Sequence, residues 1–238
     1  MLTAGVLIAS AGAANAAVPE QQCQRGRYFA MGKHVACVNK ALARGVSDFS
    51  TKFEDGLAKC RVKYVQTWPT LQKQAAASTC GDPRFEDNGD GTVTDHLTGL
   101  VWEKKTDDAS LHDKDNTYSW STSAAGAGNG TAFTTFLATL NTGACFAGNC
   151  DWRLPTIAEL LSILLPEPYP CTTNPCVDAT VFGPINPFSA YWSASTDSTA
   201  ASDPTSQAYS WSVFLDSGHV STQFKAGNGA VRAVRGGL

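Results

Sequence analysis

Residues 84–102 read RFEDNGDGTVTDHLTGLVW, a pattern of three short strands joined by two tight turns. The Asn-Gly and Asp-Gly pairs at 88–91 are typical of turns, because glycine adopts the required backbone conformations freely. Apolar side chains recur along the expected strands at Phe85, Val93, Leu100 and Trp102. We therefore expect an antiparallel meander that turns these four side chains toward a core.

The charge of the chain changes sign near Cys80. Residues 21–80 hold ten Lys or Arg and three Asp or Glu, whereas the residues from Gly81 onward hold eight and seventeen. This shift predicts a region over 17–80 and a separate domain over 81–238. The basic region is either an ordinary solvated surface or a face that docks on the acidic domain, an anionic glycan or a membrane surface.

The N-terminus has the features of an export signal. Residues 2–14 are small and apolar, and Ala14-Asn15-Ala16 fits the small-x-small cleavage pattern, although no Lys or Arg precedes the apolar run. The run is too short to span a bilayer, and no other stretch is long and apolar enough to do so. We predict a signal peptide over 1–16 and a mature chain in the periplasm, outside the cell or on its surface.

The region 17–80 is predicted to form a helical hairpin closed by disulfides. Apolar residues recur at helical spacing between Tyr28 and Leu71, with Gly45 suited to the connection and Pro69 suited to restarting a helix. In two antiparallel helices, the numbers of facing residues add up to a nearly constant sum. Nested disulfides meet this condition better than crossed disulfides do. An even number of cysteines in an exported chain indicates disulfides, whereas zinc would need closer spacing or His partners. The predicted pairs are Cys23–Cys80, Cys37–Cys60, Cys145–Cys150 and Cys171–Cys176.

The domain after Gly81 is predicted to be α+β with mainly antiparallel strands. A short helix is expected over 131–140, and Thr156 to Glu159 forms a capping box before a second helix. The remaining strands are expected over 190–194, 208–215, 219–225 and 230–234.

Several ordered motifs resemble the C-terminal domain of Legionella collagen-like adhesins. Residues 85–102 resemble its opening, DWRLPT at 151–156 followed by Glu159-Leu160 resembles its central motif, and YWSAS at 191–195 with VRAVR at 231–235 resembles its last strands. The resemblance covers about residues 82–237. The central and closing motifs are also similar to the formylglycine-generating enzyme and sulfatase-modifying group.

This resemblance implies a C-type-lectin-like fold, with a twisted antiparallel sheet and two helices, here preceded by the stapled hairpin. It also implies adhesion or glycan binding, since adhesin members are linked to sulfated polysaccharides. The activity of the enzyme group is not carried over, because that activity needs reactive cysteines and the cysteines here bracket two tight loops.

We therefore expect an exported, non-enzymatic recognition or adhesion protein that binds a glycan or a surface protein. One alternative is a structural component of a cell-envelope complex, and another is an enzyme of the lectin-like fold. No Gly-x-Ser-x-Gly motif accompanies His96, His112 or His219, which argues against a serine hydrolase. The sequence leaves open a glycosidase with two catalytic carboxylates. We expect no nucleic-acid partner, and calcium is the one cofactor that we consider.

The candidate ligand-binding residues mix aromatic and polar side chains near the C-terminus. Alternation places Tyr209, Trp211 and Val213 on one face of a strand, where they either pack in a core or form a platform for sugar rings. The candidates are Trp192, Ser193, Ser195, Tyr209, Trp211, Asp216, His219 and Asn228, with Gln207 as a further hydrogen-bonding group.

Asp87, Asn88 and Asp90 are candidate calcium ligands, because hard oxygens in a Gly-rich turn suit that ion. An EF-hand register places Leu97 where the bidentate Glu belongs, so the alternative is a turn selected for positive φ. Arg153 precedes a helix, where it either binds an anion or pairs with a buried carboxylate such as Glu103 or Asp151.

Overall fold

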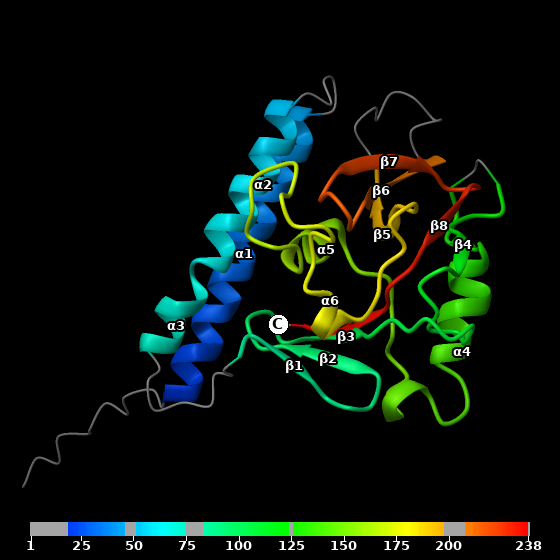
Figure 1. The fold of residues 1–238 in the computed structure, drawn as a ribbon, viewed down its shortest axis with the longest axis horizontal. Helices are drawn as coiled ribbons and strands as arrows, with labels where there is room; N and C mark the ends of the chain where they lie inside the picture. Colours follow the sequence, from blue (N-terminus) through cyan, green and yellow to red (C-terminus); the bar gives the residue numbers. More distant parts are fainter. Residues whose placement is uncertain (1–18, 46–50, 75–82, 124–125, 198–207, 238) are drawn as a thin grey trace, which may run out of the picture.

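The computed structural model describes residues 19–45, 51–74, 83–123, 126–197 and 208–237. These residues form a mixed α+β protein, in which long helices line one side of a body built from two β-sheets (Figure 1). None of the helices within these ranges is long and apolar enough to cross a bilayer.

The predicted helical hairpin is confirmed. It consists of α1 (Pro19–Gly45), α2 (Thr51–Val65) and the short α3 (Trp68–Gln74). Pro69 is the second residue of α3, where the absence of a backbone N–H costs no helical hydrogen bond. The Cys37–Cys60 disulfide joins α1 to α2 as predicted. The other predicted bridge of the hairpin runs from Cys23 to Cys80, and Cys80 lies outside the described residues.

The predicted meander is also confirmed and forms most of the first sheet. The four strands of this sheet are, in spatial order, β1 (Phe85–Asp87), β2 (Thr92–Asp95), β3 (Leu100–Glu103) and β9 (Val234–Gly236), and all neighbours are antiparallel. Val93 lies opposite Trp102, and both side chains are fully buried. Burial of these apolar groups holds the meander against the core.

The second sheet has five strands. In spatial order they are β4 (Thr117–Ser119), β8 (Asn228–Ala230), β5 (Tyr191–Thr196), β6 (Tyr209–Val213) and β7 (Val220–Phe224). The pairs are antiparallel except β5–β8, which is parallel. The expectation of a single antiparallel sheet is therefore corrected to two sheets with one parallel pair.

The single strand predicted over 230–234 is wrong. β8 ends at Ala230 and β9 begins at Val234, so the three residues between them carry the chain from the second sheet to the first. Arg232 lies in this crossover, and its buried guanidinium donates to the backbone carbonyls of Glu103 and Phe182. These long-range bonds replace the regular pairing that the local pattern suggested.

The remaining helices are short. They are a π-helix over Ala132–Leu137, α4 (Ala138–Leu140), a 3-10 turn over Phe146–Gly148, α5 (Ile157–Ser162) and α6 (Ala179–Phe182). The helix predicted over 131–140 is thus present, with π geometry in its first part. Both hydrogen bonds of the capping box before α5 are formed. The Cys145–Cys150 and Cys171–Cys176 disulfides are present as predicted.

The hairpin and the sheet-containing body share one hydrophobic core. Val38, Leu42 and Leu57 belong to the same buried cluster as residues of α5 and β6. The ring of Phe53 on α2 lies 6.2 Å from the ring of Trp211 on β6. The change of charge near Cys80 therefore does not separate two cores.

Because the core is shared, Leu57→Ala should lower the free energy of unfolding of the whole chain by about 2–5 kcal/mol, the usual cost of a cavity. Denaturant titration followed by far-UV and near-UV circular dichroism tests this, with Lys59→Ala on the exposed side of α2 as the control. Two separate transitions, with only the first affected, would show that the hairpin folds by itself.

Candidate functional site

The aromatic and serine candidates on β5 and β6 are mostly buried. The indole N–H of Trp192 donates to the carbonyl of Tyr118 over 2.7 Å, and the hydroxyl of Ser193 donates to the carbonyl of Trp211 over 2.6 Å. Trp192, Ser193 and Trp211 are each 3% exposed or less. Core packing, the alternative given for these tryptophans, is confirmed, and none of the three side chains faces a ligand at the surface.

The polar candidates support other elements. The Ser195 hydroxyl accepts a hydrogen bond from the backbone N–H of Ile157 at the start of α5, and Asp216 accepts one from Ser217 within the β6–β7 turn. Asn228 is exposed as the first residue of β8. Gln207 lies outside the described residues. These candidates are therefore divided among the interior, the start of α5, the β6–β7 turn and the start of β8.

His219 ties the β6–β7 hairpin to the helical hairpin. Its Nδ1 lies 2.8 Å from a carboxylate oxygen of Glu54 on α2, and the same oxygen accepts the backbone N–H of Val220. The Glu54 side chain is 5% exposed, while that of His219 is 37% exposed. The hydrogen bond to Glu54 raises the pKa of His219, against the opposing effect of partial burial.

One candidate, Tyr209, does reach the surface, and it has an aromatic neighbour. Tyr209 lies directly opposite Phe224 in the β6–β7 register, with ring centroids 5.7 Å apart. The two side chains are 39% and 43% exposed. We call these two residues the aromatic pair.

The position of the aromatic pair follows from the strand pattern. Tyr209 shares its face of β6 with Trp211, and Trp211 contacts the helical hairpin through Phe53, so the same sheet face is covered at one end and open at the other. β7 is the last strand of its sheet. Phe224 was not among the predicted candidates. A three-residue turn over 216–218 would place Lys225 across from Tyr209, whereas the observed register, with Val213 opposite Val220, places Phe224 there.

The calcium candidates form a self-contained turn. Asp87 accepts the backbone N–H of Gly89 and pairs with Lys104, while Asp90 accepts both the backbone N–H and the hydroxyl of Thr92. The hydrogen bond from Lys104 lowers the pKa of Asp87. Gly89 and Gly91 have φ of 74° and 87°, so the positive-φ interpretation of this turn is confirmed.

A different acidic group was missed by sequence reasoning. Asp107, Asp113 and Asp115 bring one oxygen each within 4.8 Å of one another, and such oxygens suit a hard cation. The ammonium of Lys114 lies 3.1 Å from Asp107 and 2.6 Å from Asp115, so a cation of the protein already offsets part of this charge.

Arg153 has the structural role proposed for it but a different partner. Its guanidinium forms two hydrogen bonds of 2.7 and 2.8 Å with the carboxylate of Glu159, rather than pairing with Glu103 or Asp151. Glu159 also accepts the backbone N–H of Thr156, so Arg153 anchors the capping box of α5. Asp151 pairs with Arg235 instead.

Comparison with known families identifies the sheet-containing body. The sequence profile of the Lcl C-terminal domain matches residues 91–235, more than half of the 238 residues. The chain belongs to the Lcl C-terminal domain family. No curated protein matches the chain significantly. The matched segment contains β2 to β8 and the aromatic pair, whereas the helical hairpin precedes it.

The Glu54–His219 contact predicts a pH dependence of stability. Because the folded-state pKa of His219 is raised above 6.5, its contribution is fully present below pH 6.5 and is lost as the pH rises through the folded value. His219→Gln should therefore lower the free energy of unfolding more at acidic than at alkaline pH, as measured by urea titration across this range.

Glu54→Gln provides the matched control, because it removes the carboxylate that raises the pKa of His219. In the Glu54→Gln background, His219→Gln should no longer show the acid-dependent loss. A loss of equal size at every pH in both backgrounds would refute the ionic contact.

Proposed function

We propose that this protein is an exported, non-enzymatic recognition protein that binds a glycan or a surface partner through the aromatic pair of its Lcl C-terminal domain. The observation that carries the proposal is the partial exposure of Tyr209 and Phe224 side by side at the open end of a sheet. Contiguous exposed apolar side chains mark interaction sites, whereas single exposed apolar residues are ordinary on a protein surface.

The chemistry of the aromatic pair suits a sugar or a flat protein surface. Rings of Tyr and Phe offer rigid apolar area that loses little conformational entropy on binding, and the Tyr209 hydroxyl adds a polar group. β7 is an edge strand, so its outer side adds backbone groups that a ligand can reach. An adhesin-like family gives this surface a biological context.

The non-enzymatic part of the proposal is supported by how reactive groups are used. His112 pairs with the buried carboxylate of Glu103, His219 pairs with Glu54, and burial lowers the pKa of His34 to about 4. None of the described cysteines is free. Each of these histidines and cysteines therefore already has a role within the fold, which favours a non-enzymatic protein.

The fold and the compartment belong to the same proposal. Two packed sheets with short helices and long connections are compatible with a C-type-lectin-like architecture, which would place ligands at loops and strand ends. Three disulfides among the described residues fit an oxidising compartment.

The test is binding to a glycan array and to candidate surface proteins by the intact protein and by Tyr209→Ala/Phe224→Ala. We expect the double variant to bind about tenfold or more weakly, because paired aromatic residues often dominate an interface. Phe188→Ala is the control, since Phe188 is 91% exposed and lies outside the aromatic pair.

Thermal unfolding of each variant verifies that the fold persists. Equal binding by the double variant and the intact protein would rule out the aromatic pair as the recognition surface. Equal losses from the double variant and from Phe188→Ala would point to non-specific adhesion through exposed rings.

A further inference from the structure

The cations of this protein are used in two different ways. From Arg84 onward, every described Lys or Arg is either in an ion pair or buried. On the helical hairpin, eight exposed Lys and Arg have no carboxylate partner among the described residues. We call this set the basic face: Arg25, Lys33, Lys40, Arg44, Lys52, Lys59, Lys63 and Lys73.

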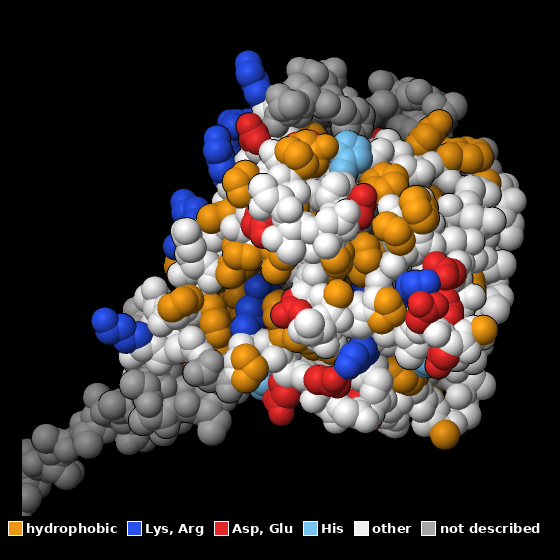
Figure 2. All heavy atoms as spheres, in the orientation of Figure 1, with side chains coloured by type: hydrophobic (Ala, Val, Ile, Leu, Met, Phe, Trp, Pro, Cys, Tyr) orange, Lys and Arg blue, Asp and Glu red, His pale blue; other side chains and the backbone are white. Residues whose placement is uncertain are grey.

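The basic face contains few compensating charges. Asp55 is the one exposed carboxylate among the hairpin side chains that the structure describes. Figure 2 shows Lys and Arg side chains along the edge formed by the helices. A cluster of unpaired cations attracts anions over roughly 10 Å at moderate salt.

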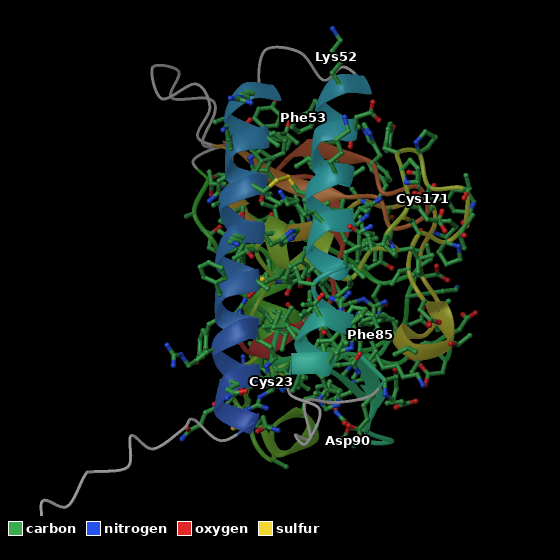
Figure 3. All side chains as sticks on the ribbon, turned by 90° about the vertical axis from the view of Figure 1, so that its left-hand side faces the viewer. Cys23, Lys52, Phe53, Phe85, Asp90 and Cys171 are labelled. Atoms are coloured by element: carbon green, nitrogen blue, oxygen red, sulfur yellow. A yellow bond between two sulfur atoms is a disulfide. The ribbon has the colours of Figure 1, made fainter. Side chains whose placement is uncertain are left out.

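A groove lies within the basic face, between α1 and α2, and has a volume of about 480 Å³. Lys33 and Lys40 of α1 line one side, and Lys63 of α2 lines the other. Figure 3 looks onto these two helices, with Lys52 pointing outward from the end of α2. Cations on both walls would surround any group that enters.

The interior of the groove is apolar rather than charged. Ala30, Ala36 and the Cys37–Cys60 disulfide line it together with the rings of His34 and Tyr64, which stack 4.4 Å apart. The aliphatic stems of the lysines extend this apolar lining, while their ammonium groups reach solvent. No carboxylate is among the residues that line it.

We propose that this groove binds an anionic phospholipid at a membrane surface. The ammonium groups of Lys33, Lys40 and Lys63 would hold the phosphate, and the apolar lining would accept part of the acyl chain. A lipid matches both chemistries of the groove, because it carries an anionic phosphate and a long apolar chain in one molecule. The remaining cations of the basic face would be attracted to the surrounding anionic headgroups.

An aromatic residue beside the groove fits the same partner. Phe29 on α1 is 66% exposed. The ammonium of Lys33 lies 4.1 Å from the centroid of the Phe29 ring, so this ring borders the groove. Aromatic and basic side chains together are typical of protein surfaces that contact the headgroup region of a bilayer. This site precedes the family domain and does not depend on the proposed function of the aromatic pair.

The experiment is co-sedimentation of the purified protein with phosphatidylcholine vesicles, with and without phosphatidylglycerol, at low and physiological salt. All variants keep the same N-terminus. We expect binding only to the anionic vesicles. Lys33→Gln/Lys40→Gln/Lys63→Gln should weaken it by about tenfold or more, since these three ammonium groups would hydrogen-bond the phosphate directly.

Two further variants separate a site from general attraction. Lys52→Gln/Lys59→Gln/Lys73→Gln removes the same charge from the basic face outside the groove and should weaken binding by only a few-fold. Ala36→Trp fills the exposed groove without changing its charge and should weaken binding as strongly as the groove triple variant. Circular dichroism checks that each variant is folded.

Equal losses from the two triple variants would overturn the proposal, because charge alone would then explain binding. Unchanged binding by Ala36→Trp would overturn it as well. Preference for heparin or for an RNA homopolymer over the anionic vesicles would assign the basic face to a different polyanion.

Discussion

The buried carboxylate of Glu103 is the contact on which the sheet-containing body depends. It lies at the end of β3, fully buried, and one oxygen contacts Lys105 and His112 while the other accepts the backbone N–H of Ala233. Burial opposes its ionisation, but Lys105 and His112 hold the pKa of Glu103 below its ordinary value. Because Ala233 is in the crossover between β8 and β9, this carboxylate fixes the place where the two sheets join.

Buried polar side chains such as Glu103, Lys105 and Ser193 bond within the fold, and the surfaces proposed for partners lie on the outside of the protein. Two surfaces stand out, the aromatic pair on β6 and β7 and the basic face of the hairpin. They are connected through β6, because Trp211 shares a strand face with Tyr209 and packs against Phe53 of α2. A rigid strand therefore sets the position of one surface relative to the other, without any need for a flexible linker.

Sequence patterns predicted those features that depend on neighbouring residues. The turns at Gly89 and Gly91, the capping box at Thr156 and the helical hairpin all follow from local backbone preferences. The crossover after Ala230 depends on distant residues and was missed, because a buried Arg232 bonds to carbonyls far away in the chain. The candidate site residues lie in several different places for the same reason, since strand alternation alone does not show which face another element covers.

Equilibrium unfolding of Glu103→Gln tests the account most directly, with Glu86→Gln on the exposed strand β1 as the control. The substitution keeps the shape of the side chain but leaves the buried ammonium of Lys105 without its partner. We predict that Glu103→Gln lowers the free energy of unfolding by about 3–5 kcal/mol in a single transition, while the control changes it little. A change for Glu103→Gln as small as that of the control would contradict the claim that this carboxylate holds the two sheets together.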